Sequence, residues 1–209
     1  MINLFTQFYI RKFRPSFNAL MTKFFYASSS IKIGRNFKTD SIPKIWIDKG
    51  CTLEIGHNVE FRRNIEIRVH GQSKISIGDN CRIDRGVRIL SNNNANIFIG
   101  SGTRIGLYSI FNGGDSISIG NKCLISGFVY LQTSMHGFAE RSKSVQDQGY
   151  LHAPIFLEED CWLGTHVVIM PGVRLKKGAV VGSNAVVNKD VEEFQVVAGI
   201  PAKPIKERN

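Results

Sequence analysis

An aliphatic residue recurs at every sixth position along much of this chain, and this period constrains the fold more than any other feature. Near the C-terminus the series is unbroken and runs through Leu157, Leu163, Ile169, Leu175, Val181 and Val187. A small or β-branched residue follows each of these four places later. A period of six is too short for a helical repeat and does not match the heptad of a coiled coil. It predicts a solenoid in which each rung buries its apolar edge against its neighbours.

The residues within each repeat predict short strands joined by corners. Val, Ile and Thr favour strands, whereas Gly, Asn and Asp favour corners that need a positive φ or a side-chain-to-backbone hydrogen bond. Three six-residue edges make a triangular coil of 18 residues, and stacked strands lie about 4.8 Å apart. We expect the array to span residues 31–191, between a helical segment over residues 1–30 and a tail over residues 192–209.

All four cysteines occupy the small inward position of the repeat. Cys51, Cys81, Cys123 and Cys161 each follow an aliphatic residue by four places, and the chain has no Cys-x-x-Cys. Small buried thiols behave as hydrophobic residues. The register therefore predicts four buried free thiols, with neither disulfides nor a metal site.

The net charge of +10 comes from 27 basic and 17 acidic residues. Many of the basic residues fall at outward corner positions, without the stacking aromatics of a nucleic-acid-binding module, so we expect no nucleic-acid partner. An anionic small molecule or an anionic surface accounts better for the excess. The chain has no stretch of 18 apolar residues and no evident signal sequence, which favours a cytoplasmic location.

Residues 1–30 differ in character from the repeats. Aromatic residues recur there at helical spacing, and no acidic residue precedes Asp40. Pro15 is expected to divide the segment into two short helices. Two compatible interpretations remain open: the helices cap the open end of the solenoid, or they contact an anionic membrane surface.

One interval in the series is much longer than a coil. Ile119 and Leu157 are 38 positions apart, which leaves a 20-residue excursion at about residues 133–153 beyond one 18-residue coil. A structureless loop of this length in a compact repeat is usually functional. It contains His136 and His152.

Five short sequences in the C-terminal half carry a family resemblance. They are Gln132 to Gly137, Asp147 to Gly149, Asp160 to Gly164, Met170 to Val173 and Ala198 to Lys203. With the hexapeptide period, they resemble the hexapeptide-repeat acyltransferases, and are similar to the maltose, galactoside and surface-polysaccharide O-acetyltransferases. The resemblance implies an all-β, left-handed parallel β-helix that forms a homotrimer with each active site between two subunits. The left hand comes from the resemblance alone, because β-crossover connections are ordinarily right-handed.

The resemblance also implies acetyl-CoA-dependent O-acetylation of a sugar hydroxyl on a surface polysaccharide or its precursor. His136 takes the place of the family's catalytic histidine, and an imidazole is suited to act as a general base near neutral pH. No nucleophile triad is visible, so direct transfer in a ternary complex is expected. The family often has a second histidine nearby, where this chain has Ser134 and Met135. His152 is a weaker candidate for acceptor binding.

Coenzyme A contacts carry over to the C-terminal coils and the tail. The matching positions are Trp162, Thr165, Ser183, Asn188, Lys189, Lys203 and Lys206. The backbone N–H of Thr165 is the expected oxyanion donor, Trp162 is expected to wall the pocket, and the lysines would face phosphates. No histidine set has zinc-site spacing, so no metal is expected. N-acetylation of an amino sugar and a non-catalytic β-helix scaffold remain as alternatives.

Overall fold

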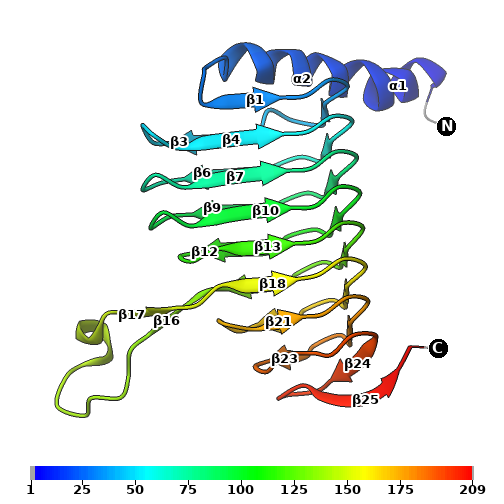
Figure 1. The fold of residues 1–209 in the computed structure, drawn as a ribbon. Coiled ribbons are helices and arrows are strands. Elements are labelled where there is room, and N and C mark those ends of the chain that lie inside the picture. Colours follow the sequence, from blue (N-terminus) through cyan, green and yellow to red (C-terminus); the bar gives the residue numbers. More distant parts are fainter. Residues whose placement is uncertain (1–2, 209) are drawn as a thin grey trace.

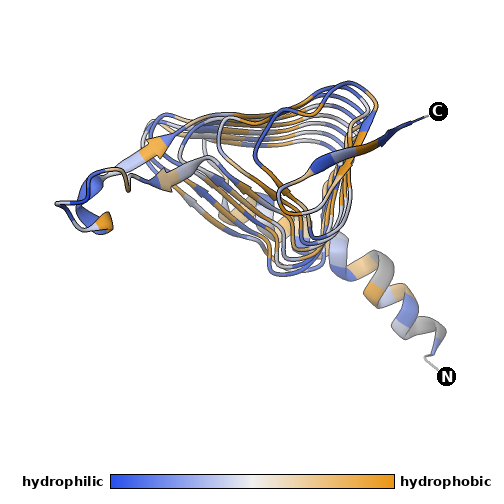
Figure 2. Cartoon of the chain, turned by 90° about the horizontal axis from the view of Figure 1, so that it is seen from below, coloured by the Kyte–Doolittle hydropathy of each residue, from blue (hydrophilic) through white to orange (hydrophobic). Residues whose placement is uncertain are grey.

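The structure is a computed structural model that describes residues 3–208. Met1, Ile2 and Asn209, which belong to the expected N-terminal segment and C-terminal tail, lie outside the described residues. Three sheets form the walls of a triangular prism, and the chain winds around them as a left-handed parallel β-helix, as the resemblance implied (Figures 1 and 2).

Each wall takes one strand from each successive coil. Wall A consists of β1 (Ile31–Ile33), β4 (Thr52–Ile55), β7 (Lys74–Ile77), β10 (Asn96–Ile99), β13 (Ile117–Ile119), β18 (Ile155–Leu157) and β21 (Arg174–Leu175). Wall B consists of β2 (Lys38–Thr39), β5 (Glu60–Phe61), β8 (Arg82–Ile83), β11 (Arg104–Ile105), β14 (Leu124–Ile125), β19 (Trp162–Leu163), β22 (Val180–Val181), β24 (Gln195–Ala198) and β25 (Lys203–Glu207). Wall C consists of β3 (Lys44–Ile47), β6 (Glu66–Val69), β9 (Arg88–Ser91), β12 (Ile110–Gly113), β15 (Tyr130–Gln132), β20 (Val168–Ile169) and β23 (Val186–Val187). All pairings within the walls are parallel except that of β24 with β25.

The register of the strands places equivalent aliphatic residues one above the other. In wall A, Leu53 pairs with Ile75, Ile75 with Ile97 and Ile97 with Ile117, and all four are buried. Burial of this kind, repeated on three walls, is the main stabilising term of the fold. The four cysteines are also buried, which confirms the inward position that their register predicts.

The corner between walls A and B shows why asparagine recurs in the repeat. Asn36, Asn58 and Asn80 adopt φ values of 56°, 55° and 58°, a left-handed conformation that asparagine tolerates better than most residues. Their side chains form a ladder, in which the Asn36 amide donates to Asn58 at 3.0 Å and the Asn58 amide donates to Asn80 at 3.1 Å.

The N-terminal segment is one continuous helical rod rather than two helices. It passes from α1 (Leu4–Phe8) through a π-helical turn, η1 (Tyr9–Phe13), into α2 (Arg14–Phe25). The expected break at Pro15 is wrong, because Pro15 lies in the first turn of α2, where a missing N–H costs least. The π-helical turn just before it accommodates the proline without ending the helix.

α2 covers the open end of the first coil (Figure 1). Pro15, Ala19 and Thr22 are buried against it. The Asn18 amide donates to the Asp40 carbonyl at 2.9 Å, and the Tyr26 hydroxyl donates to the Pro43 carbonyl at 2.9 Å. The helix therefore caps the solenoid here. Among residues 3–208 no helix is long and apolar enough to cross a bilayer.

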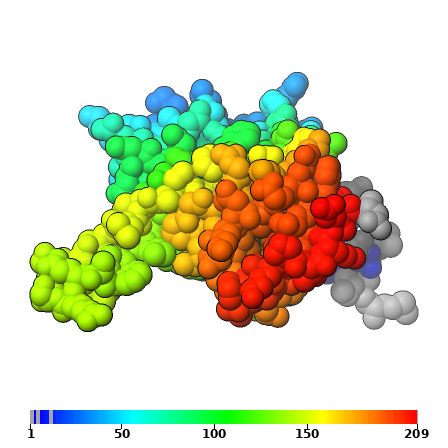
Figure 3. Space-filling view, turned by 60° about the horizontal axis from the view of Figure 1, so that its bottom comes forward, coloured from blue at the N-terminus to red at the C-terminus, as the bar shows by residue number. Residues whose placement is uncertain are grey.

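The excursion after β15 is ordered rather than structureless, contrary to the sequence-based description. β16 (Ser134–His136) and β17 (Tyr150–His152) pair antiparallel, and a short 3₁₀ helix, η2 (Val145–Gln148), lies between them. This β16–β17 arm leaves the prism at the corner between walls C and A and projects well beyond it (Figures 1 and 3).

Candidate functional site

His136 lies at the end of β16 on the projecting arm and is exposed. The antiparallel register sets His136 opposite Tyr150 and Ser134 opposite His152. The rings of His136 and Tyr150 are 4.2 Å apart between centroids. Tyr150 thus restricts the orientations of the imidazole. Sequence reasoning missed Tyr150, because only the strand pairing brings the two residues together.

The base of the arm is fixed to the prism by small residues. The Ser134 hydroxyl lies 2.8 Å from Nδ1 of His152. A Cβ on Gly114 would lie 2.1 Å from the Ser134 oxygen, so only glycine fits beneath this contact. His152, the weaker acceptor candidate, therefore has a local structural partner, and it does not approach His136 directly in the pairing.

Two of the expected coenzyme A contacts are stacked at the corner between walls B and C. Thr165 lies between β19 and β20, and Ser183 lies one coil further on, between β22 and β23. The backbone N–H of Asn184 donates to the Thr165 carbonyl at 2.9 Å. A Cβ on Gly164 would lie 2.6 Å from the Ser183 nitrogen, so the two coils approach closely here. The Thr165 hydroxyl donates to the Gly127 carbonyl at 2.8 Å.

A groove of about 860 Å³ runs along wall B beside the last strand. Trp162 and Lys206 both line it, together with Leu124, Val180 and Arg208. Trp162 is 48% exposed, so its indole is available to a ligand. The structure thus brings two of the residues predicted to bind coenzyme A to one cavity, whose apolar floor is flanked by basic side chains and by the acidic Asp160 and Glu207.

The other residues predicted to bind coenzyme A lie at the C-terminal end of the stack of coils. Asn188 and Lys189 follow β23 and are exposed. Lys203 begins β25 and pairs with Ala198, while Lys206 pairs with Val196. Figure 3 shows this end of the molecule in orange and red, with β25 lying across it.

Within one chain, His136 and the donor positions lie on different sides of the prism. The arm leaves the corner between walls C and A, whereas Trp162 and Lys206 belong to wall B, which faces that corner across the triangle. Figures 1 and 2 agree on this separation, with the arm on one side and β25 on the other. A single subunit therefore does not assemble the predicted site.

An aromatic ladder that sequence reasoning missed lies along the B–C corner. Tyr108, Phe128 and His166 occupy equivalent positions in successive coils, with φ values of 54°, 60° and 57°. Their ring centroids are 5.6 Å and 4.8 Å apart. Bulky residues are rare in this left-handed region, so the stacking must outweigh the backbone strain. The signal in the sequence is an aromatic ring where Gly or Asn usually stands.

The ladder ends beside Thr165, one of the residues predicted to bind coenzyme A. Nδ1 of His166 lies 3.1 Å from the Thr165 hydroxyl oxygen. The remaining histidines belong to the corners: Nδ1 of His57 accepts a hydrogen bond from the Arg35 backbone N–H at 2.8 Å, and His70 lies 3.0 Å from the Asp48 carboxylate.

The buried thiols of Cys81 and Cys161 are unsuited to nucleophilic catalysis. Two causes raise the pKa of the Cys161 thiol far above its ordinary value: the hydrogen bond with the Cys123 sulfur, which is the larger, and burial. Burial likewise raises the pKa of Cys81. A thiol attacks as its thiolate, so these residues are structural. In the part of the chain that the structure describes, no group of three or more His, Cys, Asp or Glu residues is arranged to hold a metal ion.

The bacterial transferase hexapeptide family, defined by six repeats, matches residues 154–189. The C-terminal coils are therefore similar to the hexapeptide repeats of bacterial transferases. This chain is 33% identical over 102 residues to a putative lipopolysaccharide biosynthesis O-acetyl transferase of Escherichia coli, across 46% of this chain and 52% of that protein. It is 33% identical over 95 residues to the galactoside O-acetyltransferase of Escherichia coli, across 45% of each chain. It is 29% identical over 104 residues to a probable acetyltransferase of Mycobacterium tuberculosis, across 50% of this chain and 35% of that protein.

The chain thus spans about a third to a half of the length of these curated relatives. Solved structures share its fold over more of the chain. AntD, an N-acyltransferase from Bacillus cereus, superposes with a TM-score of 0.59 and 20% identity, over 85% of this chain and 84% of that one. The polySia-specific acetyltransferase NeuO superposes with a TM-score of 0.51 and 23% identity, over 86% of this chain and 88% of that one.

Proposed function

We propose that this protein transfers the acetyl group of acetyl-CoA to a sugar hydroxyl of a surface polysaccharide or its precursor, in the cytoplasm. The observation that carries the proposal is the β16–β17 arm, which holds His136 exposed and away from the prism. A scaffold made only of stacked coils needs no such arm. Relatives at 33% identity are named as O-acetyltransferases of lipopolysaccharide biosynthesis and of galactosides, which supports this acceptor class.

The donor would lie along the B–C corner and the wall B groove. Solved complexes of AntD contain coenzyme A, and the matching positions here present exposed or half-buried polar groups. Lys189, Lys203 and Lys206 would face the phosphates as mobile point charges. The small side chains of Thr165 and Ser183 let an extended pantetheine arm approach the backbone.

The chemistry follows from these placements. His136 accepts the proton of the acceptor hydroxyl as that oxygen attacks the thioester carbonyl. The backbone N–H of Thr165 stabilises the oxyanion of the tetrahedral intermediate. The carbon–sulfur bond then breaks, and the departing thiolate takes the proton from the imidazolium. Tyr150, at 4.2 Å from the His136 ring, limits the orientations of the base.

The separation of His136 from the donor positions within one chain supports a site shared by two subunits. We place the arm of one subunit against the B–C corner of its neighbour, in a homotrimer that closes around a threefold axis. Each trimer would then contain three equivalent sites. The arm has the reach for this, since it projects well clear of its own prism.

N-acetylation of an amino sugar is the second candidate. AntD is named as an N-acyltransferase and was crystallised with dTDP-4-amino-4,6-dideoxyglucose. The same donor and the same general base serve both reactions, so the acceptor decides between them.

The test measures release of free coenzyme A thiol from acetyl-CoA with matched hydroxyl and amino sugars, presented as nucleotide- or lipid-linked acceptors. We expect turnover with a hydroxyl sugar and a loss of about 10²- to 10⁴-fold in kcat for His136→Ala. His70→Ala is the matched control, because His70 is a corner histidine paired with Asp48. Full turnover by His136→Ala would show that the base is another residue. Preference for the amino sugar would select N-acetylation, and no turnover with any acceptor would favour the scaffold.

A further inference from the structure

The helical rod at the N-terminus carries an exposed stripe of large apolar side chains. Tyr9, Phe13, Phe17, Leu20 and Phe24 recur at intervals of three or four positions and form this aromatic stripe. Their exposed fractions range from 45% for Tyr9 to 73% for Phe24. The rings of Tyr9, Phe13 and Phe17 stack in series, with centroids 5.8 Å and 6.1 Å apart. An exposed apolar surface of this extent marks an interaction site.

The stripe faces away from the prism. The side of α2 that contacts the first coil consists of Pro15, Ala19 and Thr22, which are buried. Each of these residues lies two positions after a member of the stripe, and two positions turn a helix by about 200°. Capping of the solenoid therefore uses one side of α2 and leaves the opposite, aromatic side without a partner. Beyond the prism edge, the first part of the rod has no coil beneath it (Figure 2).

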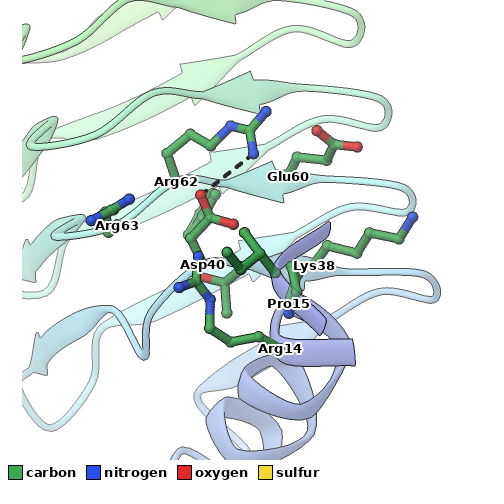
Figure 4. A pocket seen from close by; sticks show the side chains of 10 residues that line it. Arg14, Pro15, Lys38, Asp40, Glu60, Arg62 and Arg63 are labelled. Atoms are coloured by element: carbon green, nitrogen blue, oxygen red, sulfur yellow. Dashed lines mark hydrogen bonds and ion pairs between the residues drawn. The ribbon is translucent and has the colours of Figure 1, made fainter. Parts of the chain in front are cut away.

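A basic cavity lies beside the stripe, between the rod and the first two coils of wall B (Figure 4). Its volume is about 560 Å³, and its lining includes Arg14, Lys38, Arg62 and Arg63 against Asp40 and Glu60. The Asp40 carboxylate is engaged by Arg62 at 3.4 Å.

One residue that lines this cavity has a buried nitrogen without a partner. Nε of Arg14 is buried and has no hydrogen-bond partner among the residues that the structure describes. A buried guanidinium nitrogen in this state is costly unless a further acceptor satisfies it. Ile10 lines the same cavity, so the cavity adjoins the apolar rod directly.

We propose that this end of the solenoid docks on an anionic lipid bilayer, with the aromatic stripe in the interface and a lipid phosphate in the basic cavity. A helix that lies in the interface plane buries its apolar side among the acyl chains near the headgroups. Basic residues next to it gain from the negative surface potential of anionic lipids. The Arg14 side chain lines the cavity, and a guanidinium binds a phosphate through charge-assisted hydrogen bonds.

The charges favour a bilayer over a second copy of the chain. No acidic residue precedes Asp40 in the sequence. Two copies packed stripe against stripe would bring basic residues together with no acidic partner from either segment, and like charges in an interface are unfavourable. An anionic surface supplies the missing opposite charge.

The test is co-sedimentation of the full chain with vesicles of phosphatidylcholine, with and without phosphatidylserine. We expect binding to the phosphatidylserine vesicles that weakens at high salt. Replacement of three stripe residues, Phe13→Ser, Phe17→Ser and Phe24→Ser, should weaken binding roughly a hundredfold or more. The pair Arg14→Gln and Arg63→Gln should weaken it roughly thirtyfold, since each basic residue near an anionic surface contributes about 1 kcal/mol.

The matched control is the pair Arg82→Gln and Arg104→Gln, which removes the same charge from later coils of wall B. It should leave vesicle binding nearly unchanged. All stripe substitutions are at exposed positions, so the thermal melting curve should stay within a few degrees of the parent and confirm folding. Absence of binding to either vesicle would overturn the proposal. So would a stripe variant whose oligomeric mass falls while its vesicle binding is unchanged, because the stripe would then be a subunit contact.

Discussion

The two corners that flank wall C differ in how much length they tolerate. At the corner between walls B and C, the buried residues on either side of the corner are six positions apart in the sequence, as with Ile83 on wall B and Ile89 on wall C. At the corner between walls C and A, the separation changes along the chain. It is ten positions from Ile67 to Ile77 and 26 positions from Leu131 to Leu157.

The corner between walls C and A, called the variable corner below, takes up its extra residues in two ways. In the early coils the flanking strands lengthen, so that β6 and β7 each have four residues, whereas β20 and β21 in the later coils have two. In the fifth coil the excess becomes the β16–β17 arm. Neither solution disturbs the aliphatic stacks on the walls.

The corner between walls B and C, called the constant corner below, is held by contacts between coils. The aromatic ladder of Tyr108, Phe128 and His166 runs along it, and Thr165 binds the Gly127 carbonyl in the coil above. An inserted residue would displace these contacts. The proposed site divides in the same way, with the donor positions Thr165 and Ser183 on the constant corner and the base on the variable one. Variation at one corner can therefore change the acceptor while the donor site is preserved.

Four-residue insertions at the two corners should give the largest difference in stability between them. Gly-Ser-Gly-Ser placed between Asn93 and Asn94, on the variable corner, should lower the free energy of unfolding by less than about 1 kcal/mol, because loop closure depends weakly on length. The same insertion between Tyr108 and Ser109, on the constant corner, should lower it by at least about 4 kcal/mol through loss of stacking and core burial. Chemical denaturation followed by circular dichroism measures both. Equal losses would show that the two corners do not differ.

Glycine substitutions test the ladder itself with a smaller effect. Gly86 has φ +70°, and a Cβ there would lie 2.3 Å from the Tyr108 ring. Gly86→Ala should therefore cost about 2–4 kcal/mol of stability, from backbone strain and ring displacement together. Gly50 is the control on the variable corner, with φ +89° and only Cγ of Gln72 at 3.7 Å, so Gly50→Ala should cost about 1 kcal/mol.

A double-mutant cycle separates the two contributions. In the Tyr108→Ala background the ring is gone, so Gly86→Ala should cost no more than Gly50→Ala does in the parent. A cost that stays unchanged in that background would mean that the ladder does not constrain Gly86.

The smallest expected effect is a pH dependence of stability at the corner between walls A and B, where Cys81 lies. Burial raises the pKa of Cys81 above its ordinary value of 9.0, so the folded state keeps the proton where the unfolded chain loses it. The stability contributed by the protonated thiol is full below about pH 9 and declines above it, by at most about 1.4 kcal/mol per pH unit. The stability difference between the parent and Cys81→Ala, measured by urea denaturation from pH 7 to 10, should therefore shrink above pH 9. A difference that is constant over this range would contradict burial of the thiol.

The sequence contains most of the fold because the period is a local pattern. Six-residue spacing predicts the three walls, and the register of the cysteines predicts their burial, since both depend only on which residues point inward. Pro15 shows the limit of local rules, because the π-helical turn before it lets the helix continue.

The candidate site is less accessible to such reasoning. Tyr150 contacts His136 only through an antiparallel pairing inside the arm, and 14 positions separate the two in the sequence. The ladder depends on side chains of different coils meeting at one corner, in a backbone conformation that aromatic residues seldom adopt. The proposed contacts between subunits lie beyond any periodicity within one chain.

Complementation between two defective subunits tests the central claim most directly, namely that an arm and a donor corner from different copies form each site. His136→Ala would be co-expressed with the pair Lys203→Glu and Lys206→Glu, each on a different affinity tag, and mixed oligomers purified through both tags. Each variant alone should be nearly inactive. Because every mixed trimer, in either composition, has one of its three sites built from an intact arm and an intact donor corner, the mixed oligomers should regain about a third of the parental acetyl-CoA turnover. Mixed oligomers as inactive as their components would contradict the shared site.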